Sequence, residues 1–302
     1  MTSEIRKCNI CSYQGPEQGL NQESKLVPCN VRKFKHFKFL VWRCPSCQSL
    51  HAPEIVDLKM FYEGYPIRNQ KLDYFLKIWF GNIFTKLKGL GLTAQNSLID
   101  YGCNSGLWLA FLQSKGMTSL EGYDPYVEKF SSGAVLNRQY DWVFSADVIE
   151  HDSSPKDFLI KLKGLMKPEG KLAILTPNAS GIDLNQMDHF LHALHVPYHR
   201  HILSRSGLIG LAKEVGLKEI CYEGRWYMDS WWPATSRRFI ERLLLKGGND
   251  LDAGYEPVRL NLFFKHPSLL FDLFFGYFLG SKKQDHMIVV FSLDHSSANH
   301  SN

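Results

Sequence analysis

The stretch Ser97-Leu-Ile-Asp-Tyr-Gly-Cys-Asn-Ser-Gly106 decides the fold of this chain. Two apolar residues before Asp100 are typical of a buried strand, and glycine or asparagine follows at positions 102, 104 and 106. An apolar helical run, Leu107–Leu112, comes next. This order of strand, tight turn and helix directs backbone N–H groups and a helix N-terminus at a nucleotide-like ligand.

A second short strand is predicted from Leu120 to Tyr123, and it ends at Asp124. A carboxylate at that place can accept hydrogen bonds from both hydroxyls of a ribose. Asn104 stands where a dinucleotide-binding loop needs glycine for the close approach of a pyrophosphate. Asparagine tolerates a left-handed backbone but keeps its side chain, so we predict a nucleoside ligand that has no pyrophosphate.

Two further buried strands follow, and each ends in polar residues. The predicted order is a strand at 141–147, a helix at 155–166, a turn at 167–170 and a strand at 171–175. The first of these strands ends at Asp147, just before Glu150 and His151. Because the carboxyl ends of parallel strands meet at one edge of a sheet, we expect these three side chains near the glycine loop.

Taken in order, four features resemble the class I S-adenosylmethionine-dependent methyltransferases, in particular the small-molecule branch that includes the ubiquinone-pathway enzymes. They are the Asp-x-Gly-x-Asn-x-Gly loop, the acidic end of the second strand, the Val-Ile-Glu-His block and the Lys-Pro-x-Gly turn. The resemblance covers about residues 95–225 and returns at 286–293. It implies an α/β fold with a doubly wound, Rossmann-like sheet, and S-adenosylmethionine as the cofactor. The cofactor-binding candidates that it implies are Asp100, Gly102, Cys103, Asn104, Gly106, Asp124, Pro125 and Asp147.

Methyl transfer needs groups that align the acceptor and, for a hydroxyl or amine, take a proton. Glu150 and His151 are the first catalytic candidates because they follow a strand end. His199 is the second base candidate, since Val196-Pro-Tyr-His199 resembles a Pro-x-His segment of these enzymes. Asp147-x-x-Glu150-His151 also resembles the Glu-x-x-Glu-His segment through which ubiquinone-type O-methyltransferases bind a divalent metal, but with aspartate first. We expect His151 to act in acid–base chemistry or substrate positioning rather than through a catalytic metal.

Four of the seven cysteines form two Cys-x-x-Cys pairs, the spacing of a tetrahedral zinc site. The expected metal ligands are Cys8, Cys11, Cys44 and Cys47. Four thiolates leave no open coordination position on the metal. A lobe of about 50 residues also has too small a core to be stable without a metal or another cross-link, so we predict a structural Zn²⁺. The alternative is four buried or redox-active thiols, and Cys29 and His51 are spare ligands.

The formal charge of +5 belongs to the N-terminal part of the chain. Residues 1–50 carry eight Lys or Arg and three Glu, a balance of 8 − 3 = +5, whereas the remainder has 27 of each sign. The stretch Val31–Phe39 interleaves bases and aromatics, which suits either an RNA-binding face or a strand with one solvated side. We favour the solvated strand. RNA binding would require a basic stripe through Arg32, Lys33, Lys35 and Lys38.

We expect a zinc-binding lobe at 1–54, a helical linker or lid at 55–95 and a methyltransferase domain at 96–302. In the linker, a helical apolar stripe runs from Leu72 to Leu90, and Tyr62 or Tyr65 is a candidate ligand contact. The domain carries an aromatic insertion at 224–285. Its expected uses are, in order, extra core and dimer contact, a hydrophobic cap over the acceptor, and an interfacial membrane segment. Charged residues and proline interrupt its apolar run, so we expect no transmembrane segment.

The remaining elements complete the predicted sheet. We expect an acceptor-side loop with partly exposed imidazoles at 189–201, a helix at 205–214 with Ser204 as its N-cap, strands at 217–222 and 287–293, and a disordered tail at 295–302. Only 16 residues separate Asp124 from Asp141, too few for a helix and a strand. The adenine contacts therefore stay open among Ser132, Val135 and Leu136.

The sequence thus predicts a methyltransferase that acts on a small-molecule acceptor, a sugar or another pathway intermediate. Methylation of ribosomal or transfer RNA through the basic zinc lobe is the alternative, and a non-catalytic zinc-anchored scaffold is a third hypothesis. The cysteine usage and the polar N-terminus lead us to expect a reducing, cytoplasmic location. The oligomeric state stays open.

Overall fold

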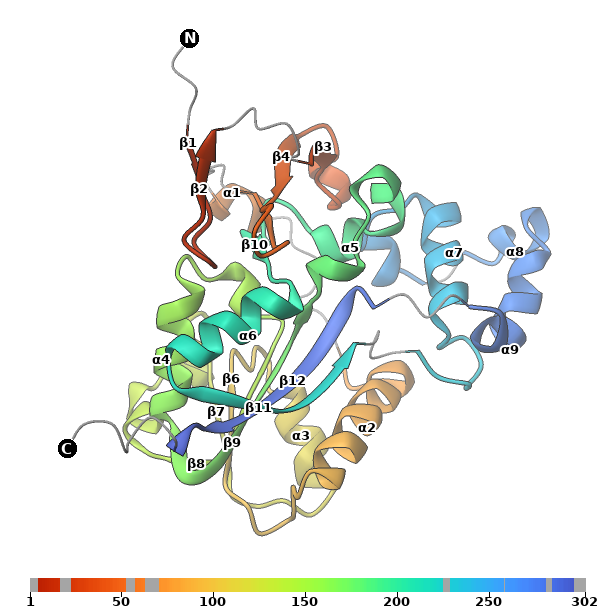
Figure 1. Ribbon diagram of the computed structural model, residues 1–302. Helices are drawn as coiled ribbons and strands as arrows, with labels where there is room; N and C mark the ends of the chain where they lie inside the picture. Colours follow the sequence, from red (N-terminus) through yellow and green to blue (C-terminus); the bar gives the residue numbers. More distant parts are fainter. Residues whose placement is uncertain are drawn as a thin grey trace.

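The computed structural model describes residues 5–16, 23–52, 58–62, 71–224, 229–257, 259–280 and 284–295. A six-stranded sheet lies at its centre in the order β11-β12-β9-β8-β6-β7 (Figure 1). The strands are β6 Leu98–Tyr101, β7 Leu120–Tyr123, β8 Tyr140–Ala146, β9 Met166–Pro177, β11 Leu217–Gly224 and β12 His286–Leu293. Strands β6 to β9 are parallel, while β12 is antiparallel to both of its neighbours.

Helices cover both faces of this sheet. They are α2 Tyr74–Gly89 and α3 Leu107–Ser114 on one face, and α4 Pro155–Gly164 and α6 Arg205–Glu214 on the other. Successive side chains of a strand point to opposite faces. In β8, Trp142 and Phe144 accordingly pack with α2 and α3, while Val143 packs with α4 and α6. The predicted doubly wound, Rossmann-like α/β fold is confirmed.

The helix boundaries follow local capping signals. Ser204 Oγ accepts a hydrogen bond from the Gly207 N–H at 2.9 Å, so α6 begins at Arg205 as predicted. Asp73 caps α2 in the same way through the Leu76 N–H, at 2.9 Å. The predicted stripe of 72–90 is therefore a helix that begins two residues later.

No strand lies between β7 and β8 within residues 124–139, all of which are described. Two short 3-10 helices, η3 Glu128–Phe130 and η4 Gly133–Asn137, connect the strands instead. The Tyr140 hydroxyl donates to the Val135 carbonyl at 2.8 Å and holds η4 against the sheet. The short spacing predicted this abbreviated connection, and it leaves β7 at the sheet edge.

The predicted turn at 167–170 lies inside β9. The pairing of β8 with β9 jumps from Tyr140 opposite Met166 to Trp142 opposite Lys171. The intervening residues therefore bulge out of a single long strand rather than separating two elements. Lys167 Nζ lies 2.9 Å from Asp141 Oδ1 and closes the bulge.

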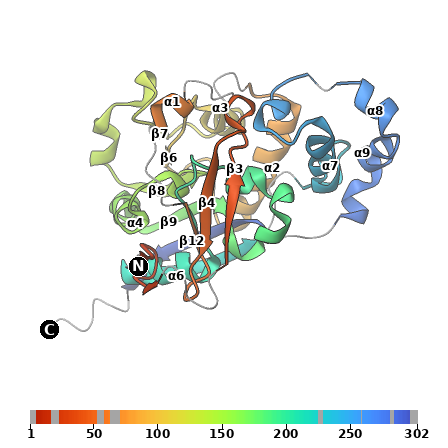
Figure 2. The same ribbon diagram turned by 90° about the horizontal axis from the view of Figure 1, so that it is seen from above.

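The N-terminal residues form two small sheets. Strand β1 Ile5–Lys7 pairs with β2 Gln14–Pro16, and a second sheet has the order β10-β5-β4-β3. Its strands are β3 Ser24–Pro28, β4 Lys38–Arg43, β5 Leu50–His51 and β10 His201–Ile202, with η1 Arg32–Phe34 between β3 and β4. Figure 2 shows β3 and β4 side by side. Because β10 lies between β9 and β11 in the chain, this sheet joins the N-terminal residues to a segment that connects two strands of the central sheet.

Arg43 strengthens that junction. Its guanidinium donates to Glu23 Oε2 at 2.6 Å, to the Ala179 carbonyl at 2.9 Å and to the Ile182 carbonyl at 2.6 Å. The latter two carbonyls belong to the segment that follows β9. One charged side chain therefore links a carboxylate of the N-terminal part to two backbone carbonyls across the junction.

The histidine-rich segment is packed rather than exposed. It contains η6 Ala179–Gly181, η7 Leu184–His189 and α5 Leu191–Leu194. His195, His199 and His201 are buried, while His189 is exposed. The expectation of exposed imidazoles is wrong for these three because Leu191, Leu194, Val196 and Tyr198 draw the segment into a core shared with β3 and β4.

The aromatic insertion is helical and lies at one side of the molecule (Figure 1). Its elements are α7 Arg237–Gly247, η8 Leu251–Gly254, α8 Asn261–Lys265 and α9 Ser268–Leu279. Buried Asp272 of α9 accepts hydrogen bonds from Arg238 and Arg242 of α7. Phe264 is 86% exposed and Phe278 is 72% exposed. These two side chains add no core, although α9 buries Leu269, and the use of α8 and α9 as a dimer contact or a cap stays a prediction.

Some predictions fall on residues outside the described ranges. They concern Tyr65 as a ligand contact, Trp226 and Tyr227 in the insertion, and the tail beyond residue 295. Tyr62 is described and ends the short helix α1 Leu58–Tyr62. Within the described ranges, no helix has the length and apolar character needed to cross a bilayer.

Candidate active site

The loop between β6 and α3 has a left-handed backbone at three alternate positions. The φ angles are +83° at Gly102, +47° at Asn104 and +76° at Gly106. A Cβ at residue 102 would lie 2.3 Å from Val148 Cγ2, and one at residue 106 would lie 2.6 Å from Phe130 Cζ. Both conformation and space therefore require glycine at these two positions, whereas Asn104 accepts the left-handed region as predicted.

Asp124 is tied to this loop by its carboxylate. The Asn104 N–H donates to Oδ2 at 3.0 Å, and the Tyr126 N–H donates to Oδ1 at 2.9 Å. Each carboxylate oxygen has two lone pairs, so both oxygens keep acceptor capacity. The half-buried carboxylate is thus held at the loop in an orientation that can accept two vicinal hydroxyls. Pro125, beside it, is exposed.

The start of α3 faces the same loop. Gly106 occupies the N-cap position, and no side chain accepts a hydrogen bond from the first turn. The amide groups of this turn carry a partial positive charge that favours an anionic ligand group.

Asp100 lies beneath the loop and is only 4% exposed. Burial raises the pKa of its carboxyl to about 8, and the nearby carboxylate of Asp124 raises that pKa further. A cation bound beside these two carboxyl groups would lower that pKa and favour the ionised form of Asp100.

Two aromatic residues complete the site, and one of them was not predicted. Phe130 packs against Gly106, and its carbonyl accepts the Asp124 N–H at 3.0 Å. A lone phenylalanine in a short connection gives no signal in the sequence, so reasoning from pattern missed it. Tyr62, a predicted contact, lies 5.2 Å from the Tyr198 ring, centroid to centroid. Its pKa is raised by burial and then by the Tyr126 phenol.

Cys103 contributes its backbone to the loop rather than a side chain. Its Sγ lies 2.9 Å from the position that a Cβ would take at Gly122 of β7. The thiol is buried, and burial raises its pKa. The side chain therefore packs beneath the loop.

A polar cluster lies where β8 ends. Glu150 and His151 belong to η5 Ile149–His151, and His199 comes from the segment after α5. One ligand-type atom from each of the three lies within 4.8 Å of the others. The structure thus brings the three catalytic candidates together.

Burial sets the charge state of this cluster. Desolvation lowers the pKa of His151 to about 4 and that of His199 well below its usual value. Desolvation, followed by the charge of Asp147, raises the pKa of Glu150 well above its usual range. Both imidazoles are consequently neutral at pH 7.

Asp147 lies beside the cluster in a left-handed conformation, with a φ of +54°. Its N–H donates to the Leu175 carbonyl at 2.9 Å. Tyr255, from the aromatic insertion, has its pKa raised to about 12 by burial and then by Asp147. The Tyr255 hydroxyl is therefore within electrostatic range of Asp147, although the residue is 39% exposed.

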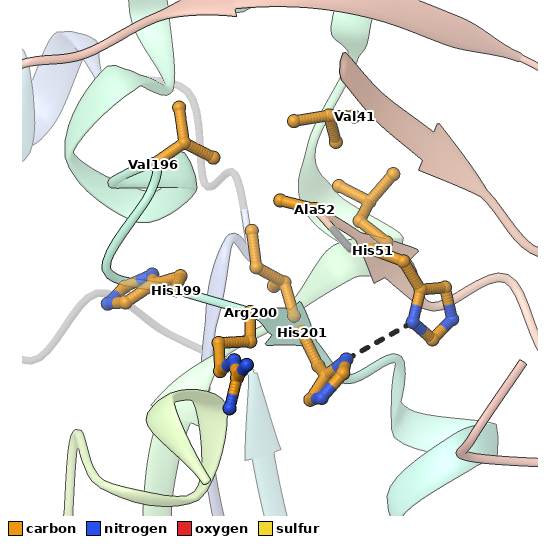
Figure 3. A pocket seen from close by; sticks show the side chains of 9 residues that line it. Val41, His51, Ala52, Val196, His199, Arg200 and His201 are labelled. Atoms are coloured by element: carbon orange, nitrogen blue, oxygen red, sulfur yellow. Dashed lines mark hydrogen bonds between the residues drawn. The ribbon is translucent and has the colours of Figure 1, made fainter. Parts of the chain in front are cut away.

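A separate histidine pair lies between β5 and β10. His51 Nδ1 and His201 Nδ1 are 3.3 Å apart, and Figure 3 shows the His199 ring on the opposite side of the same pocket. The pocket has no volume for a water-sized molecule. The pair therefore packs the junction between the N-terminal residues and the methyltransferase part and binds nothing there.

The four predicted zinc ligands converge. Cys8 Sγ lies 3.7 Å from Cys47 Sγ, and Cys11 Sγ lies 3.6 Å from Cys44 Sγ. Zn–S bonds of about 2.3 Å in a tetrahedron place sulfurs about 3.8 Å apart, so the donor set fits a zinc ion. Of the spare ligands, His51 Nε2 lies 3.2 Å from Cys8 Sγ, where it can hydrogen-bond the sulfur. Cys29 lies in a different core, with Val27 and Phe34.

A family model matches the part of the chain that contains this site. Residues 75–222 match the family model of a methyltransferase domain. The match includes the glycine loop, Asp124 and the polar cluster. No curated protein matches the chain significantly.

Solved structures align with this chain at low sequence identity and with TM-scores below 0.5. A protein of Galdieria sulphuraria assigned as a sarcosine dimethylglycine methyltransferase is 16% identical, with a TM-score of 0.42 over 72% of this chain and 84% of the other. A chain from the complex of the Trm112 methyltransferase activator and its assigned methyltransferase, from Haloferax volcanii, is 12% identical, with a TM-score of 0.48 over 79% and 98%. Coclaurine N-methyltransferase, bound to N-methylheliamine and SAH, is 13% identical, with a TM-score of 0.42 over 71% and 70%.

The fold and the matched domain define the class. The chain carries a class I methyltransferase domain, and it is an S-adenosylmethionine-dependent methyltransferase. The hypothesis of a non-catalytic scaffold is accordingly not retained.

We expect Cys44→Ser to remove one zinc ion per chain and to lower the melting temperature by about 5 °C or more, because the cluster joins both knuckles of the N-terminal residues. Metal analysis and thermal denaturation measure both effects. Cys221→Ser is the matched control, since this half-buried cysteine of β11 is outside the cluster. Unchanged metal content in Cys44→Ser would contradict the assignment.

We expect Asp100→Asn to stabilise the fold more at pH 8 than at pH 5. The folded pKa of about 8 lies above the unfolded value of 3.8, so this carboxyl loses its stabilising contribution as pH rises between those values. The variant cannot ionise, and its advantage over the wild type should grow by about 4 kcal/mol between the two pH values. Denaturant titrations measure the difference, with exposed Asp188→Asn as the control. A difference in stability between variant and wild type that does not change with pH would show that the pKa of the Asp100 carboxyl is not raised.

Proposed function

We propose that this enzyme methylates a small molecule, a sugar or another biosynthetic intermediate, as the small-molecule branch of its class does. The observation that carries this proposal is the internal neutralisation of the basic N-terminal stretch. Arg32 pairs with Asp250 at 3.0 Å and with Glu256 at 2.6 Å, and Lys35 Nζ lies 3.8 Å from Asp250. Two of the four bases of the predicted RNA-binding stripe are thus occupied by acidic residues of the insertion.

The cofactor roles follow from the loop geometry. We assign the ribose hydroxyls to Asp124, and the amino acid part of the cofactor to the loop of Asp100, Gly102, Cys103, Asn104 and Gly106 with the start of α3. Pro125 and Asp147 would border the adenosine and the methyl group. When bound, S-adenosylmethionine supplies a methyl group that its sulfonium activates for displacement.

The transfer is an in-line substitution. The bond between the methyl carbon and sulfur breaks with its electron pair on sulfur, the acceptor atom forms the new bond to carbon, and a hydroxyl or amine acceptor also releases a proton. We assign Glu150, His151 and His199 to the acceptor side, because they lie at the strand end next to Val148, which packs on Gly102. Their burial excludes water from the site of transfer.

The other parts of the chain support this site. We propose a structural zinc lobe at 1–54, a helical linker or lid at 55–95 and the catalytic domain at 96–302. Tyr62 from the lid and Tyr255 from the insertion would close the acceptor side. The exposed aromatic surface of α8 and α9 is a contact surface, for a second copy or a membrane interface, whose partner the proposal leaves open.

A transfer assay tests the acceptor class. We expect purified protein with methyl-labelled S-adenosylmethionine to label a small-molecule fraction of a cell extract, and labelling should persist at raised salt. Asp124→Ala should lose most labelling, and Glu128→Ala, at an exposed neighbouring position, should retain it.

Label incorporated into RNA, with a steep loss as salt rises, would support the RNA alternative instead. Nuclease treatment of the labelled fraction separates the two outcomes. Label that survives nuclease and passes a small-molecule filter supports the proposal.

A further inference from the structure

We propose that Glu150, His151 and His199 bind a divalent transition-metal ion, distinct from the zinc of the cysteine cluster. The ligand atoms would be Glu150 Oε1 and the Nε2 atoms of both histidines. Metal binding itself does not depend on the proposed function. Only the role of the ion in binding the acceptor rests on that function. Its first observation is geometric: three donors from two chain segments converge within 4.8 Å in the interior.

The carboxylate supplies an independent observation. Glu150 is fully buried, and its Oε2 accepts the Thr176 hydroxyl at 2.9 Å. Oε1 has no hydrogen-bond partner among the described residues. A buried carboxyl oxygen without a partner is costly, and a cation bound at this atom would satisfy it where the described residues supply no donor.

Both imidazoles are oriented for metal binding. His151 Nδ1 lies 2.9 Å from the Tyr198 carbonyl, and His199 Nδ1 lies 2.8 Å from the Ala193 carbonyl. A carbonyl accepts only, so each Nδ1 carries the proton and each Nε2 keeps its lone pair. Metal-binding histidines use this arrangement to fix their tautomer.

The backbone fixes the ligands relative to one another. The Arg200 N–H donates to the Glu150 carbonyl at 2.9 Å and joins the segment of His199 to η5. The rings of His151 and His199 are 4.8 Å apart, centroid to centroid, and meet edge to face. The site is therefore held by hydrogen bonds before any ion binds.

The distances leave room for an ion rather than for a direct hydrogen bond. His199 Nε2 lies 3.8 Å from Glu150 Oε1, beyond hydrogen-bond range. Two ligands at about 2.1 Å from a tetrahedral ion lie about 3.4 Å apart. Small side-chain rotations would close the difference between the two distances.

The ligand set differs from the one implied by sequence resemblance. Asp147 is outside the group, and His199, 48 residues after His151, replaces it. Two imidazoles and one carboxylate suit zinc, iron or manganese ions, whereas magnesium prefers oxygen ligands. Three protein ligands leave one position open, which a donor atom of the acceptor, such as a hydroxyl oxygen, can occupy.

Cobalt binding tests this site without an activity assay. Full-length protein that holds zinc at its cysteines is treated with a mild chelator, dialysed and titrated with Co²⁺, while absorption spectra and metal content are recorded. We expect one Co²⁺ per chain without thiolate-to-metal charge transfer, in addition to the retained zinc. Glu150→Gln and His199→Ala should weaken this Co²⁺ binding at least about 10-fold. His189→Ala, at an exposed histidine, is the matched control and should leave it unchanged.

Binding of S-adenosylhomocysteine by each variant shows that it is folded. Failure of wild-type protein to bind this Co²⁺, or equal affinity in Glu150→Gln and His199→Ala, would overturn the metal site. If the protein still transfers methyl groups at the full rate after chelation, the ion does not bind the acceptor. The proposed function would then stand without the metal. Co²⁺ binding in a protein that methylates no small molecule would sustain the site and reject the proposed acceptor.

Discussion

The hydrogen bond from the Asn104 N–H to the Asp124 carboxylate joins the two segments on which the proposed cofactor site depends. It can form only because the loop takes left-handed turns at 102, 104 and 106, which bring the chain back toward the end of β7. Val148 and Phe130 fill the space that side chains would otherwise need at the two glycines. One backbone conformation thus sets the position of a carboxylate, a helix start and the neighbouring strand end.

The N-terminal residues are built into this arrangement rather than attached to it. Strand β5 pairs with β10, two residues after His199, and Arg43 binds carbonyls that follow β9. The histidines that we assign to the acceptor side therefore depend on a sheet whose other strands come from the proposed zinc lobe. A structural metal in one part of the chain can in this way stabilise a site in another, which gives the lobe a physical role without RNA.

Local patterns predicted the central fold because each strand and helix carries its own signal. The glycine spacing, the serine at the start of α6 and the alternation of β12 are readable from neighbouring residues. Burial of His195 and His199 was not readable, since it depends on packing against β3 and β4, over 150 residues earlier. The contact of Phe130 with Gly106 and the grouping of His199 with Glu150 are likewise tertiary contacts, which the periodicity of the sequence does not predict.

The central claim is that the loop and Asp124 together bind the nucleoside of the cofactor. Calorimetric titration of S-adenosylhomocysteine into wild-type protein and Asp124→Ala tests it most directly. The account predicts saturable binding to the wild type and affinity lower by about 10-fold to 100-fold in the variant, the loss of charge-assisted hydrogen bonds. Equal affinity in the two proteins, or no binding to the wild type at millimolar ligand, would contradict it.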